Sequence, residues 1–158
     1  MTAPASFDLA GRVALVTGGN GGIGRGIALG FAQAGAAVAI FGRSTAKNAE
    51  ALAALQGAGA RAMALAVDVT DRAALEPAFR RVEAELGPVD ILVNNAGIAN
   101  LSGGILQETA ESWDNVIETQ LNAVFLLSKL AAASMVGRKR GKIINLGSMY
   151  SYFGAGPI

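Results

Sequence analysis

The chain has 158 residues, enough for one domain with a substantial core, and 52% hydrophobic against 16% charged residues is a globular composition. Its 13 basic and 12 acidic residues give a net charge of +1, which offers no broad positive field to nucleic acid or an anionic membrane. The sequence contains no cysteine and no histidine, which excludes disulfides, thiolate nucleophiles, cysteine–histidine zinc sites and histidine bases, and we expect no metal site.

Neither the N-terminal residues nor the most apolar stretch of the chain predicts a membrane protein. Residues 1–6 lack the basic and apolar pattern of a signal peptide. The most apolar long stretch, Leu121–Val136, is interrupted by polar residues and predicts a buried helix that is too short and too polar to span a bilayer. The basic stretch Arg138–Lys142 predicts the solvated end of that helix. We therefore expect a cytoplasmic protein.

Short aliphatic runs alternate with longer amphipathic segments along the chain. The runs are apolar on both faces, as in parallel strands covered by helices on both sides, and comprise Val13–Thr17, Ala37–Phe41, Ala62–Val67, Ile91–Asn94 and Lys142–Leu146. The segments between them predict helices over Gly22–Ala34, Ala46–Gln56, Asp71–Leu86 and Ala110–Val136. Glycines 35, 57 and 87 mark the ends of the first three helices, and Thr70-Asp71 marks the start of the third. This alternation predicts an α/β fold, a Rossmann-like doubly wound parallel sheet whose five strands are the N-terminal part of a larger sheet.

The first predicted strand runs directly into a glycine-rich turn at residues 17–24. The turn matches GxGxxG from Gly19 and the related spacing TGxxxGxG from Thr17. Because it joins a strand to a helix, its backbone amides could approach a pyrophosphate at the positive end of that helix, although a tight turn without a ligand is the alternative. The turn predicts a dinucleotide-binding domain over residues 1–158, with cofactor contacts from Thr17, Gly18, Asn20, Gly22, Ile23 and Gly24.

The end of the second predicted strand bears on which dinucleotide is bound. An acid there would bind a free ribose 2′-hydroxyl, but the strand ends in Gly42-Arg43 and the next acid is Glu50. The Arg43 guanidinium suits a 2′-phosphate, which favours NADP as cofactor with NAD as the alternative. A solvent-facing arginine that begins the next helix is the other interpretation. The missing acid also argues against a methyltransferase on a similar sheet.

Three further motifs follow the later strands. They are Asp68-Val69, the segment 94–97 with the sequence NNAG, and Ser148. Together with the glycine turn, their order and spacing resemble the short-chain dehydrogenase/reductase family over essentially the whole chain. The resemblance implies that Asp68 accepts from the adenine amino group and that the Val69 amide donates to the ring, whereas a turn-capping Asp68 is the alternative. It also implies a nicotinamide ribose side lined by Asn94, Ala96 and Gly97, with a structural role for Asn94 equally open.

The resemblance also implies two catalytic groups. Ser148 corresponds to the family's serine, which hydrogen-bonds the substrate oxygen, and Gln120 stands where the family has an asparagine that anchors a relay water. The longer glutamine could hold that water or bond the substrate directly. The family's tyrosine acid/base is expected thirteen positions after the serine, outside this sequence, with a lysine four residues later. Tyr150 and Tyr152 have glycine at the lysine position, so we expect the chain alone to be inactive.

These motifs predict an oxidoreductase that transfers a hydride between NADP(H) or NAD(H) and a carbonyl/secondary alcohol pair of a small molecule. Residues 141–154 resemble the branch that acts on sugar acids, such as deoxygluconate dehydrogenases, with 3-oxoacyl-carrier-protein reductases as the second alternative. A catalytically inactive nucleotide-binding or scaffold protein of the same fold is the non-enzymatic alternative. The apolar Ala110–Val136 helix predicts a homodimer or homotetramer, since the family associates through this helix.

Overall fold

The computed structural model describes residues 7–99, 103–149 and 152–153. Its centre is a five-stranded parallel sheet in the order β3-β2-β1-β4-β5. The chain winds outward from β1 to β3 and then returns to place β4 and β5 on the other side of β1. This confirms the predicted doubly wound, Rossmann-like α/β fold. The strands are β1 Val13–Thr17, β2 Ala37–Gly42, β3 Ala62–Ala66, β4 Ile91–Asn94 and β5 Lys142–Asn145.

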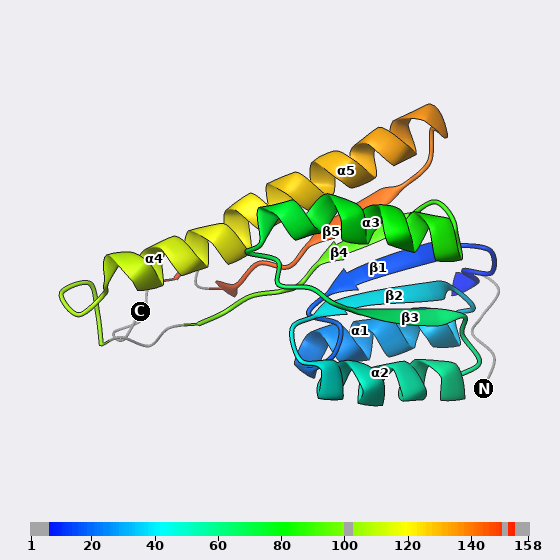
Figure 1. Cartoon of the computed structure of the whole chain (residues 1–158), viewed down its shortest axis with the longest axis horizontal. Coiled ribbons are helices and arrows are strands. Elements are labelled where there is room, and N and C mark those ends of the chain that lie inside the picture. The colour runs from blue at the N-terminus through cyan, green and yellow to red at the C-terminus, as the bar shows by residue number, and fades with distance from the viewer. Residues whose placement is uncertain (1–6, 100–102, 150–151, 154–158) are drawn as a thin grey trace.

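Helices cover both faces of the sheet (Figure 1). The helices α1 and α2 lie on one face, and α3 and α5 lie on the other. Side chains of β1 alternate between the two layers, so that Leu15 packs into the α3–α5 core and Val16 into the α1–α2 core. The helices are α1 Gly22–Gln33, α2 Thr45–Gly57, α3 Arg72–Leu86, α4 Ala110–Ile117 and α5 Ala123–Gly137, with a π-helical segment η2 Glu118–Asn122 between the last two.

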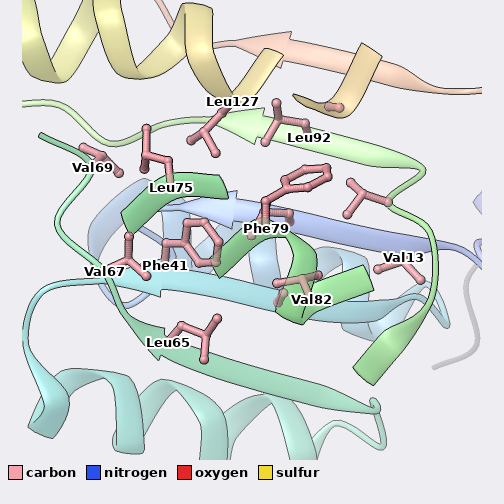
Figure 2. Packing of buried hydrophobic residues seen from close by; sticks show 14 of the residues in the cluster. Val13, Phe41, Leu65, Val67, Val69, Leu75, Phe79, Val82, Leu92 and Leu127 are labelled. Carbon is pink, nitrogen blue, oxygen red and sulfur yellow. The ribbon is translucent and has the colours of Figure 1, made fainter. Parts of the chain in front are cut away.

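The core beneath α3 contains the largest buried side chains. Figure 2 shows Leu75, Phe79 and Val82 of α3 above the strands, with Phe41 of β2 nearby and Leu127 of α5 beside them. Phe41 and Phe79 are fully buried. Aliphatic residues make up the rest of this layer, as the low aromatic content of 6% requires.

The last helical region differs from the prediction. We expected one continuous α-helix over Ala110–Val136, but the five π-helical residues of η2 divide it into α4 and α5. Apolar periodicity does not report such an insertion, because the residues on both sides keep their spacing. The combined helix Ala110–Gly137 has 28 residues and is, by length and composition alone, long and apolar enough to cross a membrane, whereas the sequence prediction concerned only its part Leu121–Val136. Leu127, Ala131 and Met135 of α5 pack into the core on the α3 side of the sheet.

Two predicted helix boundaries hold and a third moves by two residues. Gly35 and Gly87 have the left-handed φ values of +92° and +109° that favour glycine after a helix. The second helix instead continues through Gly57, and the left-handed residue is Gly59 at φ +86°. Asp71 caps α3 as predicted, because its side chain accepts from the amides of Ala73 and Ala74.

The amino ends of the central strands are joined by the buried carboxylate of Asp90, which is 4% exposed. It accepts hydrogen bonds from the Val13 amide at 3.2 Å, from Arg138 at 2.7 Å and from Arg140 at 3.0 Å. The composition of the basic stretch Arg138–Lys142 predicted a solvated helix end. Two of its arginines instead bind this buried carboxylate. Burial raises the pKa of Asp90, but these hydrogen bonds outweigh it and hold the pKa below its ordinary value.

We expect Asp90→Asn to lower the free energy of unfolding by about 2 kcal/mol at pH 7, because both arginines lose a charged partner. A carboxylate whose pKa is lowered in the folded state stabilises it above the unfolded pKa of about 4 and loses that contribution as pH falls through the folded pKa. Urea titrations at pH 7 and pH 3 should therefore show a smaller difference between parent and variant at pH 3. The exposed Asp114→Asn is the matched control, and an equal loss in both variants would contradict the role of Asp90.

Candidate functional site

A cavity of about 530 Å³ opens at the carboxyl ends of β1 to β4. This is the edge at which open α/β sheets bind ligands. The glycine turn forms one wall, and the segments that follow β2, β3 and β4 form the others. The described lining residues are Gly18, Asn20, Gly21, Gly22, Ile23, Gly24, Phe41, Gly42, Arg43, Val67, Asp68, Val69, Asn95, Ala96, Gly97, Ile98 and Thr119.

The glycine turn is both tight and open toward the cavity. A Cβ added to Gly24 would lie 2.3 Å from the Gly18 carbonyl oxygen, so no larger residue fits where the helix packs on the turn. A Cβ added to Gly21 or Gly22 would instead meet no atom of the described residues within 4 Å, apart from its chain neighbours and its own helix. No side chain caps α1, and its first turn contains no acid. The amides at this helix end therefore offer a site for an anion such as a pyrophosphate.

Thr17 lies below the cavity and joins two of its walls. It is 2% exposed and does not line the space. Its hydroxyl oxygen accepts from the amides of Asn95 at 3.0 Å and Ala96 at 2.9 Å, and it donates to the Val93 carbonyl at 3.4 Å. The side chain of Asn95 donates in turn to the Thr17 carbonyl at 2.8 Å. Thr17 thus positions the segment after β4 against the glycine turn.

Asn94 is also buried, beneath the cavity at the end of β4. Its side-chain nitrogen donates to Asn145 Oδ1 at 2.8 Å and to Ser128 Oγ at 3.1 Å. These bonds join β4 to β5 and to α5, which corresponds to the structural alternative for this residue. Its own Oδ1 is buried without a hydrogen-bonding partner in the described part of the chain.

Arg43 and Asp68 lie beside each other in the cavity wall, after the neighbouring strands β2 and β3. An Nη1 of Arg43 lies 3.9 Å from Oδ2 of Asp68, and both side chains are substantially exposed. The other carboxylate oxygen of Asp68 accepts from the Thr70 amide and hydroxyl at 3.0 and 2.8 Å. Asp68 thus caps a turn with one oxygen, as in the turn-capping alternative, and pairs with Arg43 through the other, while its contact with an adenine amino group stays a prediction.

The two predicted catalytic residues lie outside the described wall of the cavity. Gln120 is in η2, and its side-chain oxygen accepts from the Ile98 amide at 2.9 Å. It therefore supports a residue that does line the cavity. Ser148 is exposed and follows β5. Tyr150 lies outside the described residues, and Tyr152 is exposed.

An ion pair joins η2 to the start of α3. Arg72 donates to both carboxylate oxygens of Glu118, and Asn122 donates to Oε2 of Glu118 at 2.8 Å. These hydrogen bonds lower the pKa of Glu118 to about 2. The pair links the π-helical segment that contains Gln120 to the segment just after Asp68.

The predicted site residues do not include several that shape this site, among them Asn48, Asn95, Ile98 and Thr119. Asn95 had a signal, since it is the second asparagine of the NNAG segment and follows a buried strand. Ile98 and Thr119 line the cavity because the tertiary fold brings their segments to it, and no local pattern predicts that contact. Asn48 was predicted only as part of a helix, yet it is buried and hydrogen-bonded to the ends of two strands.

Comparison with known proteins gives consistent matches. The short chain dehydrogenase family matches residues 12–156. The chain is 39% identical over 152 residues to gluconate 5-dehydrogenase of Gluconobacter oxydans, covering 96% of this chain and 59% of that protein. It is 42% identical over 151 residues to 3-oxoacyl-acyl-carrier-protein reductase of Escherichia coli, covering 95% of this chain and 60% of that protein. The chain thus spans about 60% of the length of these curated relatives.

A solved structure supports the same match. A metagenomic short-chain oxidoreductase in complex with NADP superposes with a TM-score of 0.89 at 34% identity. The match covers 94% of this chain and 67% of the other.

We expect Thr17→Val to lower the free energy of unfolding by about 2 kcal/mol, because it leaves the amides of Asn95 and Ala96 without their acceptor in a partly buried place. Urea denaturation followed by circular dichroism measures this loss. Thr17→Ser keeps the hydroxyl and is the matched control, which should lose less than half as much. A loss in Thr17→Val no larger than the loss in Thr17→Ser would mean that the hydroxyl contributes no more to stability than the methyl group, and would contradict this role.

Proposed function

The chain belongs to the short-chain dehydrogenase family, and from that premise we propose that the protein is an oxidoreductase that uses NADP(H). Its substrate would be a carbonyl/secondary alcohol pair. The observation that supports this most directly is the uncapped amino end of α1, which faces a cavity bordered by Arg43. Together they provide sites for a pyrophosphate and for a second phosphate beside it.

The residues present fit such a dinucleotide. The open space over Gly21 and Gly22 accommodates phosphate oxygens, and the first-turn amides of α1 are available to donate to them. Arg43 is exposed at the end of β2, where a guanidinium can bind a 2′-phosphate. Asp68 lines the cavity, where its carboxylate suits the adenine amino group, and Ala96 and Gly97 leave room for the nicotinamide ribose. NAD(H) is the alternative cofactor.

A nicotinamide supplies or accepts the hydride at the substrate carbon. In this chain, Ser148 would donate a hydrogen bond to the substrate oxygen and so stabilise charge that develops there. By the family resemblance, the proton is exchanged with a tyrosine thirteen positions beyond Ser148. Gln120 would act through Ile98, whose amide it holds at 2.9 Å, and so shape the wall beside the reacting groups.

The substrate class that we propose is a sugar acid, with a 3-oxoacyl thioester as the alternative. The two relatives reported above are named for these two classes of substrate, which supports both. Turnover of a panel of oxo-sugar acids and 3-oxoacyl thioesters by the intact protein separates them. Nucleotide binding without turnover of either class would favour the inactive scaffold alternative.

We also propose self-association through α4 and α5. Together with η2, these helices expose four large apolar side chains along their length, which are 58–73% accessible: Trp113, Leu121, Phe125 and Val136. Such an apolar surface is typical of a protein interface, and a homodimer or homotetramer would cover it. We expect the protein to act in the cytoplasm, where metabolism supplies NADP(H).

We expect Arg43→Ala to weaken NADPH binding roughly 10- to 100-fold, the worth of a charge-assisted hydrogen bond to phosphate, and to leave NADH binding within about twofold. Titration followed by nicotinamide fluorescence measures both dissociation constants in the intact protein. Arg81→Ala removes an exposed arginine from α3 and is the matched control. A parent protein that binds NADH as tightly as NADPH would contradict the role of Arg43.

We expect Gln120→Ala to lower turnover several-fold with little change in cofactor affinity, because the Ile98 amide loses its acceptor while the glycine turn is untouched. Steady-state kinetics of the intact protein give kcat, and titration gives the dissociation constant of NADPH. Gln120→Glu keeps an oxygen acceptor and should retain more activity than the alanine variant. Unchanged turnover in Gln120→Ala would rule out this role.

A further inference from the structure

Asn48 is a polar side chain buried where a helix covers a sheet. It lies in the first turn of α2 and is 5% exposed. Its side-chain nitrogen donates to the carbonyl oxygens of Gly42 at 2.9 Å and Leu65 at 3.1 Å. An amide nitrogen has two hydrogens, and both are used here. The amide cannot turn over, because its oxygen would then face two carbonyl oxygens.

This orientation determines that of Asn20 in the glycine turn. The oxygen of Asn48 accepts from the side-chain nitrogen of Asn20 at 2.7 Å. Asn20 must direct a donor toward that oxygen, which leaves its own amide oxygen unused. In the described part of the chain this oxygen has no hydrogen-bonding partner, and Asn20 lines the cavity. A carbonyl oxygen accepts from a hydroxyl group and repels a phosphate oxygen.

The same two asparagines fill the space above Gly42. A Cβ added to Gly42 would lie 2.2 Å from Nδ2 of Asn20 and 2.7 Å from Oδ1 of Asn48. A carboxylate at this end of β2, from which an acid would bind a ribose 2′-hydroxyl, would therefore displace one of these asparagines. Recognition of the 2′ substituent is left to the next residue, Arg43.

We propose that Asn48 is a positioning residue for recognition of the adenosine ribose. It holds Asn20 with the amide oxygen toward the adenosine ribose, where this oxygen accepts from the 3′-hydroxyl while Arg43 binds the 2′-phosphate. In a dinucleotide whose 2′-oxygen is phosphorylated, the 3′-hydroxyl is the donor that remains on that ribose. The inference rests on the proposed function, since it requires a nucleotide in the cavity.

The test compares ADP, 3′-deoxy-ADP and 2′-deoxy-ADP by isothermal titration of the intact protein. The parent should bind ADP roughly fivefold more tightly than 3′-deoxy-ADP, the worth of one hydrogen bond. Asn48→Leu has a similar size but no hydrogen-bonding groups, and it should reduce that ratio to about one while leaving the ratio of ADP to 2′-deoxy-ADP unchanged. Gln56→Leu, an exposed position on the same helix, is the matched control and should keep both ratios.

A second variant reaches Asn20 by another route. Gly42→Ala displaces Asn20 through the added methyl group while the carbonyls that bind Asn48 remain. Gly42→Ala should also lose the discrimination between ADP and 3′-deoxy-ADP. If Asn48→Leu does not fold, this ratio in Gly42→Ala tests the inference instead.

Uniform weakening of all three nucleotides in Asn48→Leu, with both ratios kept, would make Asn48 merely structural and overturn the inference. A parent protein that binds ADP and 3′-deoxy-ADP equally would overturn it as well, without affecting the proposed function. A parent protein that binds no nucleotide, NADPH included, would overturn the proposed function itself.

Discussion

The hydroxyl group of Thr17, at the end of β1, joins two walls of the cavity by hydrogen bonds. Thr17 accepts from two consecutive amides of the segment after β4 and donates to the last part of that strand, so the glycine turn and this segment keep a fixed spacing. Further hydrogen bonds hold the other walls against the turn and this segment. The Asn95 side chain donates to the Thr17 carbonyl, and Gln120 accepts from the Ile98 amide. Asn48 accepts from Asn20 of the turn and donates to the Gly42 carbonyl at the end of β2. A rigid anion site at a helix end is useful only if such walls stay in place.

Much of the architecture follows from local patterns. Strands that are apolar on both faces, separated by helices of ordinary length, permit few arrangements other than a doubly wound parallel sheet, and the five strands were located to within about a residue. The glycine turn, Arg43 and Asp68 were also recognisable, because the carboxyl ends of neighbouring parallel strands meet at one edge. The contacts that hold these groups depend on pairs distant in sequence, such as Asn20 with Asn48 and Gln120 with Ile98, which no local pattern records.

The π-helical segment shows why the remaining differences arose. Apolar spacing on either side of η2 is regular enough to predict a single α-helix, yet the five residues Glu118–Asn122 adopt a wider turn. Within it, the Glu118 carboxylate is bound by Arg72 from α3, and Gln120 reaches the segment after β4. Tertiary hydrogen bonds of this kind outweigh local propensity, and π-helical turns are frequent at functional sites for that reason.

The buried carboxylate of Asp90 lies at the opposite edge of the sheet from the cavity. It joins the amino ends of β1 and β4 to the turn before β5, while every described residue that lines the cavity lies toward the carboxyl ends or beyond. The candidate site thus lies at one end of these strands, and Asp90 adds stability at the other end. A lineage can replace residues that line the cavity, and so acquire new substrates, while Asp90 at the amino ends of the strands preserves the scaffold. Two relatives that resemble this chain over nearly its whole length are named for gluconate and for 3-oxoacyl substrates.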